Sequence, residues 1–271
     1  MMTVTGLWIY PIKSCQGIEL TEMNIQSTGP VHDRQFMLVN ETGLFLSLRT
    51  HPKLSQIQTE INQEQLVLKT PMAQHRVSLR SSEAAVQTDV QIFKKYFKAD
   101  LVSEEVDQAL SDWLHEKVRL VRFNPNSYRS LGAGAEAFSQ FTQFADSRPV
   151  LLTNEASVGS LNEKLKSLNE PLTEMKRFRP NIVVRGLDAF AEEKIKKIRI
   201  GSVEFENPEL CSRCVIVTQD SQTGAVASKA TLKILPLHST EKGPKLMFGL
   251  HLRPSNAGLI RRGDPVTAEF V

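Results

Sequence analysis

Short runs of apolar or β-branched residues, separated by turn sequences, dominate the first hundred residues of the chain. Alternation of apolar and polar positions is typical of strands that bury one face. The pattern predicts strands at residues 4–10, 18–25, 35–39, 44–48, 66–68 and 76–79. Between two of them, Asn40-Glu41-Thr42-Gly43 predicts a hairpin turn, because Asn and Gly tolerate the backbone angles that such turns require.

Two later segments change to helical periodicity. Ser103 precedes two glutamates, which is typical of a helix start, and the apolar residues that follow at helical spacing are Leu110, Trp113, Leu114 and Val118. A second helix is predicted at residues 155–168, with Asn154 as its N-cap. We expect a domain boundary near the first helix. Residues 1–100 then form an N-terminal β-rich domain, and residues 101–271 form a second domain that includes a long connecting segment.

The second half of the chain returns to short strands. They are predicted at residues 149–153, 181–185, 198–205, 215–219, 245–252 and 265–270. Many short strands with few helices predict a mainly β protein of the α+β kind, built on a barrel or a sandwich. Residues 123–145 have no clear period and predict a long loop, which is either functional or packed on the core through Phe138, Phe141 and Phe144.

Composition excludes several classes of protein. With 271 residues, 41% of them hydrophobic, the chain can bury a large core. Its net charge is +3 and its basic residues are scattered, so the sequence does not predict a nucleic-acid partner. Three cysteines, an odd number, favour a reducing compartment over a disulfide framework. We found no export signal and no stretch long enough to cross a membrane, and we therefore expect a cytoplasmic protein.

Cys211 and Cys214 are three positions apart, and the second lies at the start of the apolar strand predicted at residues 215–219. A thiolate beside a guanidinium such as Arg213 can attack an electrophile or bind a soft metal. The alternative is a pair of small buried side chains, since free cysteine is common in protein cores. A zinc site would need two further ligands, which Cys15 and the dispersed histidines do not supply at a recognisable spacing. Dithiol exchange is not favoured, because such pairs usually open a helix rather than a strand.

Three further groups combine cations with small polar residues. Lys13 and Ser14 follow a predicted strand in a turn, which suits binding of a phosphate. Arg34 comes directly before another strand. Arg179 and Asn181 belong to a basic segment in which two arginines flank an aromatic residue, a mixture that can bind a heteroaromatic ring and a phosphate together. Each group alone is equally typical of an ordinary surface turn, a capped strand or a solvated charge cluster.

Taken in order, these motifs resemble a known family. They are Tyr-Pro-x-Lys-Ser-Cys at residues 10–15, Asp-Arg at 33–34, Asn-Glu-Ala-Ser at 154–157, Arg-Phe-Arg-Pro-Asn at 177–181, Cys-x-Arg-Cys at 211–214 and Gly-Asp-Pro-Val at 263–266. The set is similar to the molybdenum cofactor sulfurase C-terminal (MOSC) domain proteins, in the branch of the mitochondrial amidoxime-reducing component and its bacterial homologues. The resemblance extends over nearly the whole chain and implies a MOSC β-barrel preceded by an N-terminal β-rich domain.

The resemblance also implies a set of site residues. Cys214 would ligate the molybdenum of a single pyranopterin cofactor, molybdenum-molybdopterin, and would be the catalytic residue, with Arg213 beside it favouring its thiolate. Further positions match cofactor contacts in the family: Lys13, Ser14 and Arg34 for the phosphate and pterin, Arg179 and Asn181 as a second group, Ser147 and Arg148 as a third, and Ser212 and Arg213, with Asp146 as an addition.

The activity implied is the reduction of small N-hydroxylated substrates, such as hydroxylamines, amidoximes and N-hydroxylated bases, independent of pyridoxal phosphate. The cofactor would supply two electrons for breaking the N–O bond. This sequence contains no iron–sulfur domain of the kind found in many bacterial relatives and no membrane-targeting segment. We therefore expect a separate electron-transfer protein, of flavin, iron–sulfur or cytochrome type, and no membrane. The alternative is a molybdenum cofactor carrier, or a sulfur-transfer protein that uses a Cys214 persulfide.

Overall fold

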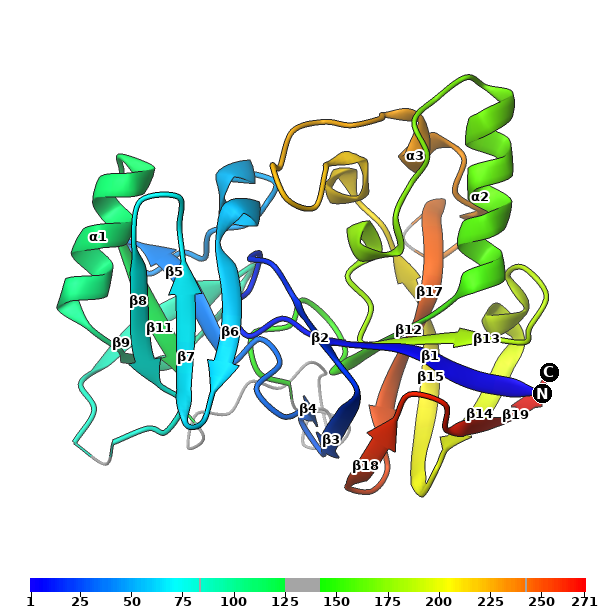
Figure 1. The fold of residues 1–271 in the computed structure, drawn as a ribbon, viewed down its shortest axis with the longest axis horizontal. Coiled ribbons are helices and arrows are strands. Elements are labelled where there is room, and N and C mark those ends of the chain that lie inside the picture. Colours follow the sequence, from blue (N-terminus) through cyan, green and yellow to red (C-terminus); the bar gives the residue numbers. More distant parts are fainter. Residues whose placement is uncertain (83, 125–141, 242) are drawn as a thin grey trace.

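A closed barrel of seven strands forms the larger unit of the computed structural model (Figure 1), which describes residues 1–82, 84–124, 142–241 and 243–271. In order around the barrel, the strands are β12 (Val150–Asn154), β13 (Ile182–Arg185), β1 (Met2–Ile9), β19 (Pro265–Phe270), β14 (Ile195–Ile200), β15 (Val203–Ser212) and β17 (Lys245–Pro254). The barrel closes because β12 pairs with β17 as well as with β13. Only the β12–β13 pair is parallel.

Aliphatic side chains fill the barrel. The fully or almost fully buried members of this core include Leu7, Leu152, Ile182, Ile200 and Leu250. Burying each such side chain stabilises the fold by about 1.5–3 kcal/mol. The alternating pattern in the sequence predicts these inward positions, and the prediction of a mainly β protein with a barrel is confirmed.

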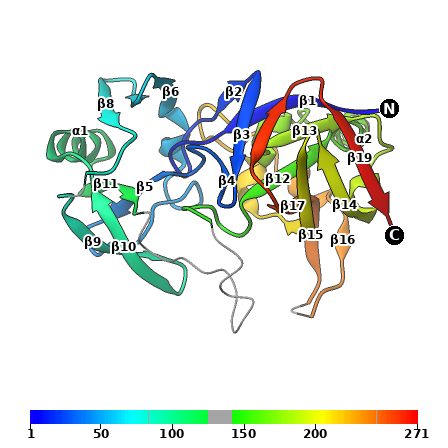
Figure 2. The same cartoon turned by 90° about the horizontal axis from the view of Figure 1, so that it is seen from below.

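A second unit lies beside the barrel, as Figures 1 and 2 both show. It contains helix α1 (Glu104–Leu114), a four-stranded sheet with the order β5 (Phe36–Asn40), β11 (Val118–Phe123), β10 (Lys95–Leu101) and β9 (Gln87–Ile92), and a three-stranded sheet of β6 (Gln58–Asn62), β7 (Gln65–Lys69) and β8 (Gln74–Ser78). Their apolar faces share one core, in which Leu38, Leu66, Leu110 and Leu120 are buried. We call this unit the N-terminal lobe.

The chain crosses between the two units early. Strand β1 belongs to the barrel, and the short strands β2 (Ile18–Leu20), β3 (Glu22–Gln26) and β4 (Gly29–Pro30) stay close to it, with β3 pairing β18 (Gly258–Arg261). Only with β5 does the chain enter the N-terminal lobe. The division near residue 100 stays a prediction, but the strand pairing places the first strand in the barrel.

Both helix starts follow the sequence. The Ser103 hydroxyl accepts a hydrogen bond from the Val106 amide at 3.4 Å, and the Asn154 side chain accepts one from the Ala156 amide at 3.2 Å. They cap α1 and α2 (Glu155–Ser167) at the predicted positions. The turn at Asn40 is also confirmed, since the Gly43 amide donates to the Asn40 carbonyl at 3.0 Å and Gly43 has a φ of 80°.

Several predicted strands are wrong in detail. Residues 44–48 form only isolated bridges at Leu44 and Phe45. Residues 18–25 divide into β2 and β3 because the first pairs with β1 and the second with β18. Residues 198–205 divide into β14 and β15 around a turn at Gly201. Residues 215–219 are largely a 3₁₀ helix, η5 (Val215–Thr218), in spite of their β-branched side chains.

The short 3₁₀ helix η5 forms because tertiary contacts outweigh local preference. Val217 is buried against Phe178 and Phe248, and its amide donates to the Cys214 carbonyl at 3.3 Å. Seven strands were not predicted: β4, β6, β9, β10, β11, β16 (Leu237–His238) and β18. Val118, expected on the first helix, instead begins β11, since α1 ends at Leu114. The remaining elements are η1 (Pro52–Gln56), η3 (Met175–Phe178), η4 (Ala191–Lys194) and α3 (Ala230–Lys233).

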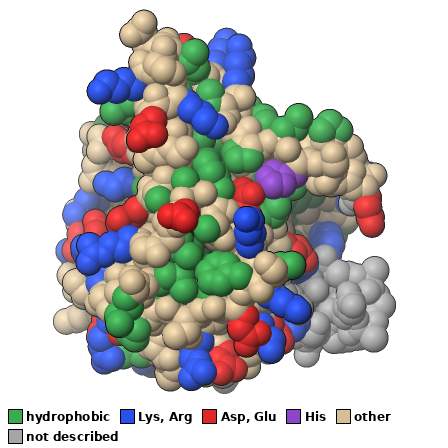
Figure 3. Space-filling view, turned by 90° about the vertical axis from the view of Figure 1, so that its right-hand side faces the viewer, with side chains coloured by type: hydrophobic (Ala, Val, Ile, Leu, Met, Phe, Trp, Pro, Cys, Tyr) green, Lys and Arg blue, Asp and Glu red, His purple; other side chains and the backbone are tan. Residues whose placement is uncertain are grey.

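The predicted long loop is described only at its ends. Phe138 and Phe141 lie outside the described residues, whereas Phe144 is fully buried with its ring centroid 5.9 Å from Phe97 and 5.6 Å from Phe123. Phe144 therefore packs on the core of the four-stranded sheet. None of the helices in the described parts of the chain has the length and hydropathy needed to span a membrane. On the face in Figure 3, basic and acidic side chains are interspersed, as the scattered charges of the sequence predict.

A buried carboxylate ties helix α2 to the barrel. Glu192 is fully buried, and its carboxylate accepts hydrogen bonds from the Ser157 hydroxyl at 2.7 and 2.9 Å and from the Asn154 side chain at 3.2 Å. The Ser157 oxygen also accepts a hydrogen bond from the Phe190 amide at 2.8 Å. A single hydroxyl thus satisfies polar groups of two neighbouring segments.

We expect Ser157→Ala to lower the free energy of unfolding by about 1–3 kcal/mol, because it leaves a buried carboxylate and a buried amide short of a partner. Chemical denaturation followed by circular dichroism measures the change. The control is Ser160→Ala on the same helix, which should change the free energy by no more than about 0.5 kcal/mol. Equal effects of the two substitutions would contradict this role of Ser157.

Candidate functional site

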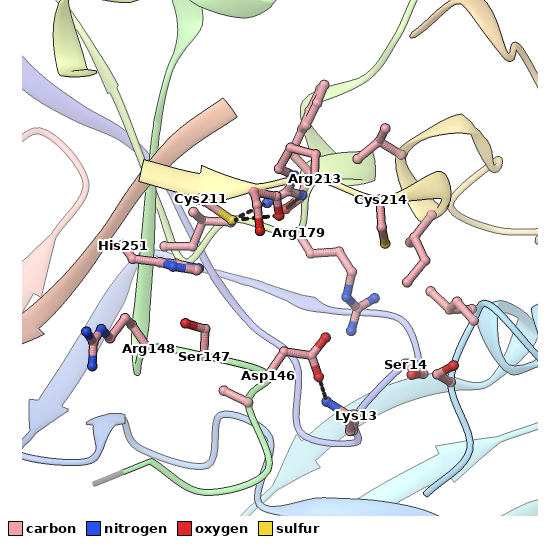
Figure 4. A pocket seen from close by; sticks show the side chains of 18 of the residues that line it. Lys13, Ser14, Asp146, Ser147, Arg148, Arg179, Cys211, Arg213, Cys214 and His251 are labelled. Carbon is pink, nitrogen blue, oxygen red and sulfur yellow. Dashed lines mark hydrogen bonds and ion pairs between the residues drawn. The ribbon is translucent and has the colours of Figure 1, made fainter. Parts of the chain in front are cut away.

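A pocket of about 640 Å³ lies between the barrel and the N-terminal lobe, and part of it is drawn in Figure 4. All of the site residues suggested by the sequence line it: Lys13, Ser14, Arg34, Ser147, Arg148, Arg179, Asn181, Ser212, Arg213 and Cys214, with the additional Asp146. They come from segments that are far apart in the sequence. The fold brings them together because β1, β12, β13 and β15 all direct their ends or the following turns toward this pocket.

Lys13 and Ser14 lie in the turn after β1. The Lys13 amide donates to the Phe36 carbonyl at 2.8 Å, which fixes the turn against the first strand of the N-terminal lobe. Its ammonium group is buried, donates to the Phe144 carbonyl at 2.9 Å and forms an ion pair with Asp146. Ser14 has a φ of 71°, in the left-handed region. The Phe144 carbonyl and the Asp146 carboxylate therefore hold the Lys13 ammonium group inside the pocket.

Arg34 and Asn181 form a second group. The Arg34 guanidinium donates to the Asp33 carboxylate, to the Asn181 side-chain oxygen at 3.2 Å and to the Arg179 carbonyl at 3.3 Å. Asn181 also accepts a hydrogen bond from the Leu151 amide and donates one to the Trp8 carbonyl, both at 3.1 Å. Burial raises the pKa of Asp33, although the Arg34 guanidinium opposes this shift. Asn181 thus fastens the basic segment to two barrel strands.

Two guanidinium groups pack against the ring of Tyr10. Arg34 lies 4.5 Å and Arg179 lies 4.2 Å from the ring centroid, and Arg179 donates to the Cys15 carbonyl at 2.7 Å. Burial raises the pKa of Tyr10 to about 12 against the opposing effect of the arginines, and burial lowers the pKa of Arg179 to about 10. At neutral pH the phenol is therefore neutral and Arg179 keeps its charge. Contact with the electron-rich Tyr10 ring reduces the free-energy cost of holding the two guanidinium groups close together.

The backbone is strained at three of these residues. Ser14, Arg34 and Arg179 have φ values of 71°, 50° and 54°, in a region that non-glycine residues rarely adopt. Such conformations cost roughly 1–3 kcal/mol each and occur mainly at functional sites, where surrounding contacts enforce them. The three strained residues all line the same pocket.

The two cysteines lie where a strand ends, which corrects the expectation that the second one opens a strand. Cys214 directly precedes η5. Cys211 is the second-last residue of β15, where the β15–β17 register shifts between Leu210 and Ser212. A bulge of this kind redirects side chains. Figure 4 shows both sulfur atoms at the wall of the pocket.

Their surroundings also differ from the expectation that Arg213 acts on Cys214. The Arg213 guanidinium instead donates to the Cys211 sulfur at 2.9 Å, and a different residue, Arg49, donates to the Cys214 sulfur at 3.6 Å. Burial opposes ionisation of Cys211, but the charges and hydrogen bonds of Arg213 and His251 outweigh it and lower its pKa to about 6. Sequence order alone cannot reveal which sulfur a neighbouring arginine reaches.

Arg148 and Ser212 occupy the outer parts of the pocket. The Arg148 guanidinium forms an ion pair with Glu209 of β15, with a distance of 3.1 Å from Nε to one carboxylate oxygen. Ser212 is exposed. In Figure 4, Arg148 lies on the side of His251 and points away from Cys214. The structure brings these residues to the pocket but gives Arg148 a protein partner of its own.

The lining residues with a charge or an aromatic ring that the sequence analysis did not single out include Arg49, Phe93, Arg177, Lys245 and His251. Arg177 belongs to the basic segment at residues 177–181, but the sequence analysis did not single it out as a site residue. It is buried, and its Nε and Nη1 atoms have no hydrogen-bond partner among the described residues. The Nε atom of Arg213 is in the same condition. Buried donors of this kind normally have a partner, which makes these atoms exceptions within the described part of the chain.

The charge of the pocket favours an anionic ligand. Its lining contains eight lysine and arginine side chains but only the carboxylates of Asp146 and Glu209. Guanidinium groups suit phosphate, and a half-buried thiol suits a soft metal. The residues present therefore fit a phosphate-bearing cofactor that carries a soft metal within reach of Cys214.

Comparisons with known proteins place the chain among relatives. The MOSC N-terminal beta barrel domain matches residues 1–117, and the MOSC domain matches residues 140–267. The mitochondrial amidoxime-reducing component 1 of Homo sapiens is 31% identical over 97% of this chain and 82% of its own length, and component 2 of Macaca fascicularis is 32% identical with the same coverage. The molybdenum cofactor sulfurase of Oryza sativa subsp. japonica is 29% identical over 90% of this chain, which spans 31% of that protein.

This similarity extends over both units of the fold and includes the segments that build the pocket. The names of these relatives associate the MOSC fold with the molybdenum cofactor. The chain belongs to the family of MOSC domain proteins that includes the mitochondrial amidoxime-reducing components.

Proposed function

We propose that the protein is a molybdenum-cofactor-dependent reductase of N-hydroxylated compounds. One observation carries the proposal: a half-buried thiol, Cys214, lies at the wall of a pocket whose charged lining residues are mostly lysine and arginine. The relatives named amidoxime-reducing components support the choice of reaction.

The cofactor would be held by separate groups of residues. Lys13, Ser14 and Arg34 would bind its phosphate and pterin, with Arg179 and Asn181 continuing the same side of the pocket. Cys214 would supply the one protein ligand to the metal. Arg49 donates a hydrogen bond to the Cys214 sulfur at 3.6 Å.

Ser147, Arg148, Ser212 and Arg213 also line the pocket. We propose them as outer contacts of the cofactor. Arg148 is already paired with Glu209, so its contribution requires either a shared or a water-mediated interaction. The Arg213 guanidinium already donates to the Cys211 sulfur at 2.9 Å and to the Phe178 carbonyl at 2.6 Å, so it would contribute mainly through its charge.

The reaction fixes what the protein must provide. Reduction of R–NHOH to R–NH₂ consumes two electrons and two protons and releases one water molecule. When bound, the cofactor supplies the two-electron redox chemistry. The protein positions the substrate beside Cys214, neutralises the charge of the cofactor and limits access of water. A separate electron-transfer protein would restore the electrons.

A second candidate function is a cofactor carrier or a sulfur-transfer protein that uses a Cys214 persulfide. Similarity to a molybdenum cofactor sulfurase favours it, as does a second thiol in the same pocket, Cys211, with a lowered pKa. A carrier should release its cofactor readily to an acceptor enzyme, whereas a reductase should retain the cofactor through purification.

We expect wild-type protein to contain nearly one molybdenum atom per chain and the Cys214→Ser variant to contain little, because the variant lacks the soft ligand. Elemental analysis of the purified proteins measures this. Cys211→Ser is the matched control, since one thiolate suffices, and it should lose much less metal. Similar contents in wild type and Cys214→Ser would refute the ligand assignment.

We expect reduction of benzamidoxime or hydroxylaminopurine only by protein made in cells that synthesise the cofactor. The assay uses an artificial electron donor, so that the natural partner is not needed. Protein from cells without the cofactor pathway serves as the comparison. Equal activity of the two preparations would rule out the proposed mechanism.

We expect the thiols to be separable by pH in cofactor-free protein. Because Arg213 and His251 lower the pKa of Cys211 to about 6, its alkylation by iodoacetamide should rise with a midpoint near pH 6. Burial raises the pKa of Cys15 to about 12, so Cys15 should stay unmodified at neutral pH. Peptide mass spectrometry measures both.

The substitution Arg213→Gln should move the Cys211 midpoint upward, because it removes the cation that favours the thiolate. In denaturant the midpoint should move to about 8.5, the value of a free cysteine. A profile in the folded protein that equals the denatured one would show that Arg213 and His251 do not ionise Cys211.

A further inference from the structure

Two side chains of the N-terminal lobe line the pocket beside Cys214 and belong to neither the proposed cofactor contacts nor the core. Arg49 lies in the turn that follows the bridge residues Leu44 and Phe45, and Phe93 lies in the turn between β9 and β10. The residues assigned to the cofactor come from other segments, at 13–34, 147–181 and 212–214. These two side chains therefore form a separate part of the lining, supplied by the other unit.

Arg49 connects the thiol to the aromatic ring. Its Nη1 atom lies 3.6 Å from the Cys214 sulfur, and its guanidinium carbon lies 5.6 Å from the centroid of the Phe93 ring. A planar guanidinium above an aromatic face is a cation–π arrangement. The Arg49 guanidinium therefore links the Cys214 sulfur to the Phe93 ring.

Exposure to solvent and backbone conformation both disfavour a phenylalanine at position 93. Its side chain is 46% exposed, and its φ of 54° falls at the first residue of a two-residue hairpin turn, where glycine is usual. The ring is nevertheless held in place, because it meets Phe45 edge to face with centroids 5.2 Å apart. An exposed aromatic ring that is fixed at the edge of a pocket presents a ready surface for stacking.

We propose that Arg49 and Phe93 form the substrate-binding wall of the pocket and select planar aromatic N-hydroxylated compounds over small ones that have no ring. The inference rests on the proposed function, since it names the substrate class for that site. The Phe93 face would stack on the substrate ring. The Arg49 guanidinium, adjacent to Cys214, would donate hydrogen bonds to the polar N–O end and align it with the metal ligand.

The wall also explains why the N-terminal lobe takes part in the site. The barrel supplies Cys214, most of the cations and several apolar side chains, such as Leu151, Leu210 and Met247, but the aromatic ring on that side, Phe178, is fully buried. A substrate with an aromatic ring needs an apolar face beside the point of reaction. Within the described lining that is near Cys214, Phe93 is the aromatic ring that is substantially exposed, whereas Phe178 is fully buried.

The test compares two substrates in molybdenum-loaded protein, hydroxylaminopurine and hydroxylamine, with an artificial electron donor. Phe93→Leu should lower the ratio of kcat/KM for the purine to kcat/KM for hydroxylamine by about tenfold, mainly through KM, because stacking on the ring is lost. Phe93→Tyr should keep the ratio of the wild type, since the aromatic face remains. Leu and Tyr meet the same left-handed backbone, so the two variants share its cost.

The matched control is Tyr96→Ala. Tyr96 is on the same hairpin and is 72% exposed, but it does not line the pocket. Its removal should leave the substrate ratio unchanged. A ratio that is unaffected by Phe93→Leu, or that falls equally with Tyr96→Ala, would overturn the proposal.

A binding measurement separates failure of the wall from failure of the proposed function. Adenine cannot be reduced at an N–O bond, and its affinity for loaded protein is measured by isothermal titration calorimetry. We expect the dissociation constant to rise about tenfold in Phe93→Leu and to stay near the wild-type value in Phe93→Tyr.

The combined outcomes are then distinct. Ring-dependent binding of adenine by a protein that reduces neither substrate would refute the reductase and leave the wall supported. Reduction of both substrates with equal adenine affinity in wild type and Phe93→Leu would leave the reductase supported and overturn the wall. Absence of adenine binding by the wild type would also overturn it.

Discussion

The arrangement of the site depends on holding several positive charges in one enclosed space. Arg34 and Arg179 both pack against the Tyr10 ring, and Asp33 and Asn181 bind the first of them. Without these contacts, mutual repulsion and the cost of burial would drive the guanidinium groups toward solvent. Asn181 is anchored in turn to the barrel strands β1 and β12, and the Tyr10 amide donates to Asp33, so the barrel supports the charges indirectly.

Much of the fold could be predicted from local pattern. The helix caps at Ser103 and Asn154 depend on residues next to the helix, and they were predicted correctly. The failures depend on distant contacts. Val215–Thr218 has the side chains of a strand, but packing of Val217 on Phe178 and Phe248 selects a 3₁₀ helix.

The site shows the same division between features that follow from local sequence and features that depend on distant contacts. Motif order was enough to predict which segments meet at the pocket. Most of these motifs lie at an end of a barrel strand, whereas Arg34 precedes β5 of the N-terminal lobe. The partners of the sulfur atoms were not predictable, because they depend on side-chain direction. Arg213 turns to Cys211, and Cys214 receives its cation from Arg49, which is 165 residues away in the sequence. The roles of Arg49 and Phe93 left no local signal, since each lies in an ordinary turn.

The excess of cations in the pocket has a consequence for how the protein matures. Eight basic side chains facing two carboxylates repel one another most strongly when no anion is present, so the native state gains free energy from whatever neutralises them. By linkage, binding of an anionic cofactor and completion of folding should therefore reinforce each other. Newly made chains would thus mature at a pace set by cofactor supply.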